Sequence, residues 1–350
     1  MWISPALLTA AAALTGISSA LPSKHDGHCG PLKGNFTIKK YQLYPENADF
    51  DPDNCVLYLG QLWNASLGVY DPFKDKYLET IEFDGISHNP AFHLGGVGFD
   101  KRTGLLSMVA DAAPTFGTLG QDISGTNWLM KYDPKSHTMI YKINLTESSQ
   151  GKYGGFQDVE QDPEGNVYVI GTFPSTITKV SKDGKTVVPW YLPEVIDHTK
   201  RGTGGLAALD WMLLVQGDQS GAIWRFDMRA EKGVPHPVKI VSGNHTFGDS
   251  DAIYLPPKYK GTVLLVAEDS AGISVFRSKD AKWETAEYKG IITGANADIF
   301  NTAPIQIGES VYTILEPFGD AGLGGPGTAG NRTDFVVRDI SEEVERLLAL

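Results

Sequence analysis

Acidic side chains recur at matching places along this chain, and they are the first candidates for chemistry. Asp158, Asp251 and Asp298 each stand at the same place in a repeated strand–turn–strand unit. Three carboxylates that converge on one axis repel each other unless protons, bound water or a cation relieve them. Calcium suits such a set because it takes oxygen ligands in irregular geometry. The pattern predicts either acid–base chemistry or a calcium site, with backbone capping of turns by Asp as the alternative.

Two histidines in one segment, residues 85–94, are candidates for acid or base catalysis. We expect this segment to reach the same place as the three acidic residues, so His93 joins them as a predicted catalytic residue. His88 is predicted to contact the substrate, and a structural role is the alternative for either histidine. The sequence contains no G-x-S-x-G motif, no H-E-x-x-H motif and no cysteine nucleophile. These absences argue against covalent and metalloprotease hydrolysis.

Polar and aromatic residues are expected around the same place. The ends of the second strands contribute further polar residues, among them Asp111, Asp269 and Glu316. Long loops on a rigid scaffold commonly wall a pocket, and two are expected here, residues 111–127 and the glycine-rich residues 316–333. The predicted substrate-binding residues are His88, Phe92, Phe116, Gln121, Phe156, Gln157, Asn296 and Phe318. For each aromatic residue taken singly, packing in the core is the alternative.

The elements that must position these residues are repeats. Units begin near Gly96, Asp158, Gly205, Asp251 and Asp298, at intervals of 46 or 47 residues after one longer interval. This is the length of a four-stranded propeller blade. With one blade before Gly96, the sequence predicts an all-β fold, a six-bladed β-propeller. The long interval keeps a seven-bladed ring as the alternative.

The ends of the chain have separate roles in this prediction. Residues 1–20 have no charged side chain, an apolar middle and small residues at the end, which predicts a signal peptide. Residues 21–350 then form a single propeller domain. Residues 36–44 are expected either to serve the first blade or to close the ring, and residues 341–350 to form a short helix.

Sequons and cysteines agree with passage through the secretory pathway. The five N-x-[ST] sequons are Asn35, Asn64, Asn144, Asn244 and Asn331. The two cysteines, Cys29 and Cys55, predict one disulfide in an oxidising compartment. A metal site or a catalytic thiol is the alternative, but the spacing of the two cysteines fits no metal motif.

The charge balance limits the choice of partner. The net charge is −12, from 42 acidic and 30 basic residues, and the chain has no Lys/Arg-rich run. Nucleic acid and anionic membranes are therefore not expected as partners. After the N-terminal segment no stretch approaches the length of a membrane span. We expect a secreted or lumenal protein that is a monomer or a weak homo-oligomer.

The sequence resembles a family of propellers encoded in fungal secondary-metabolite clusters. The resemblance rests on the signal peptide, the early cysteine pair, the sequons, and the segments Leu57–Ser66, His93–Asp100 and Trp128–Asp133. That family includes the trichothecene-cluster protein fourteen and the hetero-Diels–Alderases of tropolonic sesquiterpenoid pathways. The resemblance implies binding of a small apolar or polyphenolic metabolite, such as a terpenoid or polyketide intermediate, and its cyclisation or hetero-Diels–Alder cycloaddition.

A looser resemblance links the blade pattern to the gluconolactonase-type propellers, which hold calcium with channel-lining carboxylates and amides. It implies a calcium-dependent lactonase or esterase, in which Asp158, Asp251 and Asp298 would hold the metal. The Pro-Asn-Gly motif of that family is absent, and Gly96 and Gly205 occupy two of the matching places. A secreted binding or virulence protein without catalysis is the third alternative. No cofactor is expected under the cyclase prediction, and calcium stays open under the hydrolase prediction.

Overall fold

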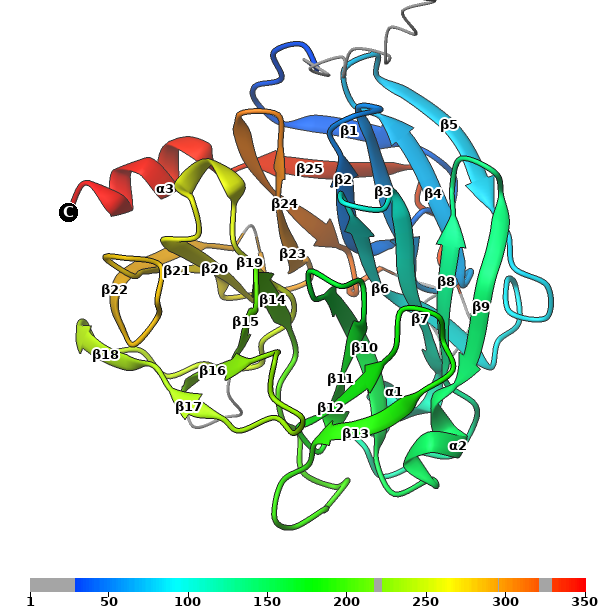
Figure 1. Cartoon of the computed structure of the whole chain (residues 1–350). Helices are drawn as coiled ribbons and strands as arrows, with labels where there is room; N and C mark the ends of the chain where they lie inside the picture. The colour runs from blue at the N-terminus through cyan, green and yellow to red at the C-terminus, as the bar shows by residue number, and fades with distance from the viewer. Residues whose placement is uncertain (1–28, 217–221, 295, 321–328) are drawn as a thin grey trace, which may run out of the picture.

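Six sheets surround a central channel in the computed structural model (Figure 1). The structure describes residues 29–350 except 217–221, 295 and 321–328. The predicted signal peptide, residues 1–20, lies outside the described residues. The all-β, six-bladed β-propeller that the repeat predicts is confirmed, and the seven-bladed alternative is wrong.

Each of the first three blades is a four-stranded antiparallel sheet whose strands follow one another in chain order from the channel outward. Blade one consists of β2 to β5, which are Pro45–Asp51, Val56–Gln61, Ser66–Asp71 and Lys76–Ile81. Blade two consists of β6 to β9, which are Phe92–Asp100, Leu105–Ala112, Trp128–Asp133 and Thr138–Asn144. Blade three consists of β10 to β13, which are Gly154–Gln161, Val167–Phe173, Thr176–Val180 and Val187–Tyr191.

The last three blades are less regular. Blade four consists of β14 to β17, which are Leu206–Leu209, Met212–Gln216, Ile223–Asp227 and His236–Pro237. Blade five has β19 to β22, which are Ile253–Tyr254, Val263–Glu268, Gly272–Arg277 and Thr285–Thr293, and a parallel outer strand β18, Lys239–Ser242. Blade six consists of β23, β24, β25 and β1, which are Phe300–Ile307, Ser310–Glu316, Asp334–Asp339 and Phe36–Lys39.

The ring is closed by strands from both ends of the chain. β1 pairs antiparallel with β25, so the N-terminal segment supplies the outermost strand of the last blade. Of the two roles expected for residues 36–44, closure of the ring is therefore confirmed. This pairing covers the edge of β25, which would otherwise expose unpaired backbone groups. The predicted C-terminal helix is also confirmed as α3, Ser341–Leu348, which packs on blades five and six.

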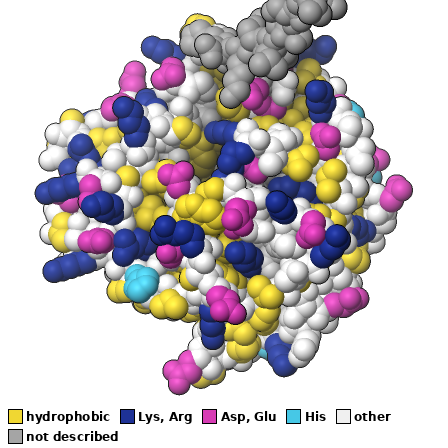
Figure 2. All heavy atoms as spheres, in the orientation of Figure 1, with side chains coloured by type: hydrophobic (Ala, Val, Ile, Leu, Met, Phe, Trp, Pro, Cys, Tyr) yellow, Lys and Arg dark blue, Asp and Glu magenta, His cyan; other side chains and the backbone are white. Residues whose placement is uncertain are grey.

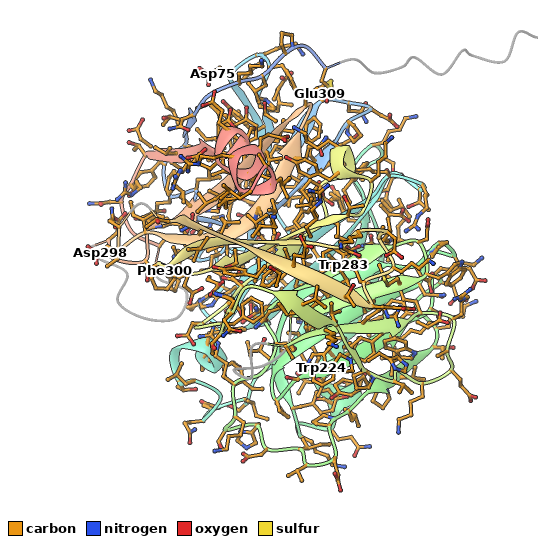
Figure 3. All side chains as sticks on the ribbon, turned by 90° about the vertical axis from the view of Figure 1, so that its left-hand side faces the viewer. Asp75, Trp224, Trp283, Asp298, Phe300 and Glu309 are labelled. Carbon is orange, nitrogen blue, oxygen red and sulfur yellow. A yellow bond between two sulfur atoms is a disulfide. The ribbon has the colours of Figure 1, made fainter. Side chains whose placement is uncertain are left out.

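Apolar side chains fill the interfaces between neighbouring blades. Among the described residues, six clusters of buried apolar side chains join neighbouring blades. One of these clusters joins blade six to blade one. Trp283, for example, is fully buried in the cluster between blades four and five (Figure 3). The inner and second strands are buried on both faces, whereas an outer strand such as β9 is largely exposed. The rigid frame thus surrounds the channel, and its ends carry the loops.

The innermost strand of blade one, β2, is not predicted by the sequence pattern. Its residues, PENADFD, contain no apolar run, yet most of them are buried. They are buried because the strand lines the channel, where polar side chains find partners. Asn47 Nδ2 donates to Asp158 Oδ1 of blade three across 3.2 Å. Propeller inner strands can therefore be polar and still belong to the core.

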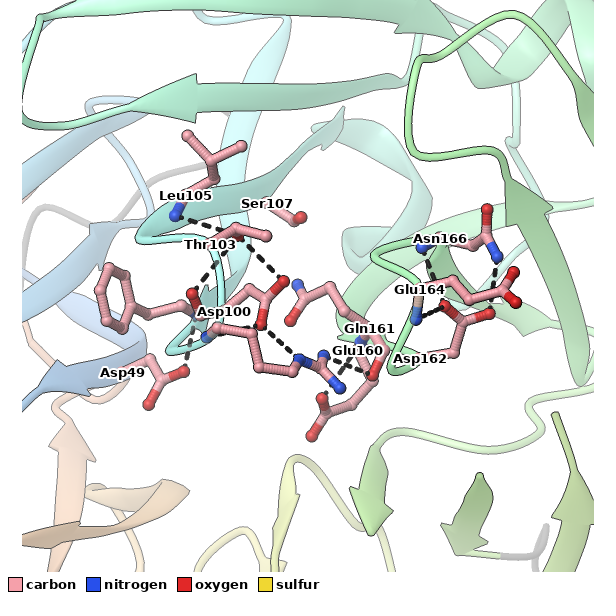
Figure 4. A network of polar contacts seen from close by, with 12 residues as sticks. Asp49, Asp100, Thr103, Leu105, Ser107, Glu160, Gln161, Asp162, Glu164 and Asn166 are labelled. Carbon is pink, nitrogen blue, oxygen red and sulfur yellow. Dashed lines mark hydrogen bonds and ion pairs between the residues drawn. The ribbon is translucent and has the colours of Figure 1, made fainter. Parts of the chain in front are cut away.

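Asp residues cap the turns between inner and second strands at the opposite end of the channel. Figure 4 shows two of these turns, in blades two and three. Asp100 accepts hydrogen bonds from the backbone N–H of Arg102 and from Thr103 Oγ1, and Asp162 accepts from the N–H groups of Glu164 and Asn166. At this end of the channel, turn capping explains the recurrent acids.

Surface features bear on the expected secretory route. The predicted disulfide is present and joins Cys29 to Cys55, with their Cα atoms 5.6 Å apart. Three of the sequon residues, Asn35, Asn244 and Asn331, are exposed. Basic and acidic side chains are interspersed on the face drawn in Figure 2. None of the helices in the described part of the chain is long and apolar enough to cross a membrane.

Candidate functional site

β-Bulges interrupt the innermost strands of three blades near one mouth of the channel. The extra residue is Glu46 in β2, Gln157 in β10 and Thr302 in β23. Bulges re-aim side chains and are frequent beside active sites. Blade two has its irregularity at Gly95–Gly96, where a Cβ on Gly96 would lie 2.6 Å from the Gln157 carbonyl oxygen. Glycine is required there because neighbouring inner strands approach too closely for a side chain.

A cavity of about 330 Å³ opens at this mouth. Its walls come from loops and strand ends of several blades, so only the closed ring can assemble it. Carboxyl groups and one cation form part of the lining, and aromatic and aliphatic side chains form the rest. The lining residues are Glu46, Leu62, Trp63, His93, Gly95, Asp111, Ala113, Phe116, Gly117, Leu119, Gln157, Phe173, Arg201, Asp251, Asp269, Phe300 and Phe318.

Two of the carboxyl groups, Glu46 and Asp111, are more than nine-tenths buried. Burial, the carboxylate of Asp251 and that of Asp158 raise the pKa of Glu46 well above its ordinary value. Burial raises the pKa of Asp111 to about 8. Among the described residues, neither Glu46 Oε2 nor Asp111 Oδ2 has a hydrogen-bond partner. The raised pKa favours the protonated form of both groups, and a protonated carboxyl group can donate a hydrogen bond to a bound molecule.

Arg201 and three acidic residues form one side of the rim. The guanidinium lies 2.9 Å from Asp249 Oδ1 and 3.9 Å from Asp269 Oδ2, and it donates to the carbonyl of Ser250 across 3.3 Å. Burial raises the pKa of Asp269 to about 6, and burial together with Asp269 raises that of Asp251 well above its ordinary value. Arg201 lowers both. The guanidinium group of Arg201 is thus already engaged by Asp249 and by the carbonyl of Ser250.

His93 and Trp63 form a second part of the wall. Their ring centroids lie 4.9 Å apart in an edge-to-face arrangement. Burial lowers the pKa of His93 to about 4, so its imidazole is neutral at physiological pH. Trp63 Nε1 donates to Glu316 Oε1 across 3.2 Å, and burial raises the pKa of Glu316 well above its ordinary value. A neutral histidine can shuttle a proton but adds no positive charge to the cavity.

The two long loops supply the aromatic walls, as the sequence predicts. The first loop contains the short helix α1, Pro114–Gly117, whose Phe116 ring lies 5.5 Å from that of Phe173 in β11. The second loop brings Phe318 to 5.1 Å from Phe300 and 6.1 Å from Trp63, measured between ring centroids. Of the second loop, residues 321–328 lie outside the described part. The cavity therefore pairs an aromatic wall with a carboxyl-bearing one.

Five predicted site residues line the cavity and the others do not. His93, Asp251, Phe116, Gln157 and Phe318 line it, and so do Asp111 and Asp269 from the second strands. His88 and Gln121 are exposed, and His88 is bound to Glu82 across 3.0 Å. Phe92 and Phe156 are buried in the inter-blade core.

Asp298 and Asn296 do not lie at the predicted position. The sequence alignment of the blade-six repeat with the other repeats is shifted relative to the register in the structure. The residue equivalent to Gln157 in blade six is Thr302, four residues after Asp298. Asp298 and Asn296 are exposed in the loop before β23, and Figure 3 shows Asp298 at the margin of the molecule. The prediction that Asp158, Asp251 and Asp298 converge is therefore wrong. The described residues contain no group of three or more His, Cys, Asp or Glu side chains that could hold a metal ion.

Asp158 is buried next to the lining residue Gln157, and its carboxylate accepts hydrogen bonds from backbone N–H groups. Its Oδ2 accepts from the N–H of Leu206 at 3.1 Å, and its Oδ1 accepts from the N–H of Val159 at 2.9 Å. The first of these bonds joins blade three to blade four. Asp158 therefore acts in holding the blades together, which is a positioning role rather than a catalytic one.

Among the lining residues that sequence reasoning misses are Glu46, Trp63, Phe173 and Arg201. Glu46 is hidden because β2 has no apolar pattern, although its place before Val56–Gln61 leaves room for an inner strand. Trp63 lies two residues after the second strand β3, and Phe173 is the last residue of the second strand β11. Asp111 is near the end of the second strand β7 in the same way. Arg201 lies in an irregular loop, and nothing in the sequence marks it.

Known proteins are similar to this chain in sequence. Residues 25–293 match the model of the Mal s 1 allergenic protein-like family. The chain is 34% identical to trichothecene biosynthesis protein 14 of Trichoderma arundinaceum, over 92% of each chain. It is 30% identical to core trichothecene cluster (CTC) protein 14 of Fusarium sporotrichioides, over 92% of this chain and 89% of that one.

A solved structure shares the fold. The crystal structure of the Malassezia sympodialis allergen Mala s 1 superposes with a TM-score of 0.75 and 23% identity, covering 88% of this chain and 96% of that one. The resemblance to fungal secondary-metabolite-cluster propellers is confirmed by the two trichothecene-cluster relatives. The chain therefore belongs to the Mal s 1 allergenic protein-like family.

Proposed function

We propose that this protein is an enzyme of a fungal secondary-metabolite pathway, which binds a small, largely apolar intermediate in the mouth cavity and directs its cyclisation. The names of the trichothecene-cluster relatives support the pathway role. One observation carries the proposal: buried carboxyl groups with raised pKa values and aromatic side chains line the same cavity of about 330 Å³. The predicted signal sequence and the sequons support a location in the secretory route or outside the cell.

The lining residues supply the two things that a cyclisation needs. Phe116, Phe300 and Phe318 exclude water and hold the hydrocarbon folded, so that the two atoms to be joined lie in contact. Asp111 or Glu46 donates its proton, or a hydrogen bond, to a carbonyl or alkene of the bound molecule. The nucleophilic atom of the same molecule then attacks the activated carbon, and the ring bond forms.

The proton balance of this step makes the reaction an isomerisation. The attacking atom loses a proton as the ring closes, and the carboxylate that donated a proton takes one back. No co-reactant is consumed, so substrate and product have the same mass. A hetero-Diels–Alder cycloaddition within one molecule also conserves mass, but it transfers no proton, and the carboxyl group then acts only as a hydrogen-bond donor to the heteroatom-bearing partner.

Disruption of the gene in a producing fungus tests the proposal. We expect an uncyclised precursor to accumulate, and purified protein added to an extract of the disrupted strain to convert it into an isomer of equal mass. A product heavier by one water would identify a hydrolase instead. An unchanged metabolite profile, with binding of the precursor but no conversion, would identify a protein that only binds.

A further inference from the structure

The aromatic side chains of the cavity form two groups in ring contact. Trp63 and Phe300 both lie against Phe318, with ring centroids 6.1 Å and 5.1 Å from it. Phe116 and Phe173 form a second pair at 5.5 Å. Aromatic rings attract a cation that lies over their faces, and the attraction strengthens when the site excludes water.

Carboxyl groups line the same cavity as these rings. Glu46, Asp111, Asp251 and Asp269 all belong to the lining. Glu46 is 8% exposed and Asp111 is 2% exposed, and each has one carboxyl oxygen without a partner among the described residues. Buried polar groups are normally hydrogen-bonded, so these oxygens point to a bound hydrogen-bond donor or positive charge.

The described lining residues offer no uncommitted positive charge to balance these acids. Arg201 is held by Asp249 at 2.9 Å and by Ser250 O at 3.3 Å, with Asp269 at 3.9 Å. Burial lowers the pKa of His93 to about 4 and keeps it neutral. With no uncommitted positive charge among the described lining residues to offset them, the acids favour their neutral forms, and a positively charged guest would favour their ionised forms instead.

We infer that the mouth cavity is a binding site for organic cations, and that the reacting intermediate of the proposed cyclisation carries a positive charge. This second clause rests on the proposed function. Protonation of the bound molecule creates a carbocation or an oxocarbenium ion, and carboxylates in a dry cavity stabilise such charge far more than water does. A neutral pericyclic route would develop little charge for the carboxyl groups to stabilise.

Proton linkage gives the site a pH dependence of known sign. The groups that face the cavity are Glu46, Asp111, Asp251, Asp269, His93 and Arg201. Burial raises the pKa of Asp269 to about 6 and that of Asp111 to about 8, so each is partly or fully neutral in mildly acidic solution. A bound cation favours the ionised carboxylates and releases their protons. Affinity for a cation therefore rises with pH from about 5 to about 8.

A matched ligand pair tests the inference without any turnover assay. Phenyltrimethylammonium and tert-butylbenzene have the same shape and differ by one positive charge. Binding of each to the purified full chain is measured by calorimetry at pH 5 and pH 8. We expect the cation to bind at least about tenfold more tightly than its neutral isostere at pH 8, and the ratio to shrink at pH 5.

Three variants separate charge from shape. Glu46→Gln should lower the cation-to-isostere ratio, whereas Arg201→Gln, which removes a positive charge from the rim, should raise it. Glu309→Gln, on an exposed turn remote from the cavity, is the matched control and should leave the ratio unchanged (Figure 3). Thermal unfolding of each variant shows that it is folded. Because Glu46→Gln and Arg201→Gln are expected to act in opposite directions, general damage to the site cannot mimic the result.

The outcomes for this inference and for the proposed function are distinct. Equal or tighter binding of tert-butylbenzene would overturn the cation site, even if the precursor is still cyclised. A clear preference for the cation would support the cation site even if the gene disruption showed no cyclisation.

Discussion

Trp63 of blade one donates from Nε1 to Oε1 of Glu316, the last residue of β24 in blade six, across 3.2 Å. Glu316 is fully buried, and its Oε2 has no partner among the described residues. The bond therefore ties an aromatic residue of the cavity wall to a buried carboxyl group across the junction where the ring closes.

Replacement of Trp63 and replacement of Glu316 should lower the free energy of unfolding by different amounts. Trp63→Phe removes the donor from a buried acceptor and should lower the free energy of unfolding by about 1–3 kcal/mol. Glu316→Gln should cost less, because the amide oxygen of Gln can still accept from Trp63 Nε1 and burial raises the pKa of Glu316 well above its ordinary value, which favours the uncharged form. Urea unfolding of both variants gives the comparison. A larger loss for Glu316→Gln would mean that the carboxylate is ionised in the fold.

Stability should fall as the pH rises above neutrality. Burial raises the pKa of Asp158 to about 7 and that of Asp111 and Glu160 to about 8. The folded protein then holds protons that the unfolded chain releases above about pH 4, so this stabilisation is complete below about pH 4 and is lost as the pH rises through about 7 to 8.

His93 contributes with the opposite sign. Burial lowers its pKa to about 4, so its contribution is present above about pH 6.5 and is lost as the pH falls toward 4. Between about pH 4 and 6.5 the three acids outweigh the one histidine, so we expect the melting temperature to be highest near about pH 4 to 5 and to drop by several degrees by about pH 9. Thermal unfolding across a buffer series measures this, and Asp111→Asn should flatten the decline. A melting temperature that climbs from about pH 6 to pH 9 would contradict the assignment of buried, protonated acids.

Most of the fold is predictable from the sequence because each blade repeats the same local pattern. Apolar runs and turn residues recur at blade length, and they identify the strands that pack between blades. The exception, β2, is informative: Glu46, Asn47 and Asp49 face the channel or neighbouring strands, so burial there selects hydrogen-bonding groups instead of apolar ones. A pattern based on hydrophobicity cannot detect such a strand.

The sequence predicts where in the fold the candidate site lies, but it predicts only some of the residues that line it. His93, Gln157 and Asp251 follow from counting along the repeat, whereas Asp298 does not, because the bulge at Thr302 fixes the register and leaves no signature in the sequence. Arg201 reaches the rim from a loop whose course depends on tertiary packing. A sequence pattern cannot predict contacts between loop residues that come together only when the ring closes.

Asp158 should matter for stability in a way that Asp298 does not. Asp158→Ala leaves the buried N–H groups of Leu206 and Val159 without their acceptor, at about 1–3 kcal/mol for each. Asp298→Asn alters an exposed loop residue and should change stability by less than about 0.5 kcal/mol. Chemical denaturation of the two variants measures the difference. Equal losses would place Asp298 in a buried contact and contradict the structure.

Loss of the disulfide should destabilise the closed ring. Cys29 and Cys55 are 26 residues apart, and a crosslink over that distance removes about 3 kcal/mol of chain entropy from the unfolded state. The double variant Cys29→Ser/Cys55→Ser should therefore unfold at a lower urea concentration with nearly the same cooperativity. Intact mass under non-reducing conditions confirms the bond in the wild type. An unchanged midpoint would show that the N-terminal segment contributes nothing to stability.

The carboxyl groups of the mouth cavity are tested most directly by conversion of the accumulated precursor with purified wild-type protein, Glu46→Gln and Asp111→Asn, with Glu309→Gln as the control. General acid catalysis contributes about 10²–10⁴-fold to rate. We predict an isomeric, ring-closed product from the wild type and from Glu309→Gln, and a loss of at least about 10²-fold in at least one of the two cavity variants. Undiminished turnover by both Glu46→Gln and Asp111→Asn would contradict the claim that these carboxyl groups carry the reaction.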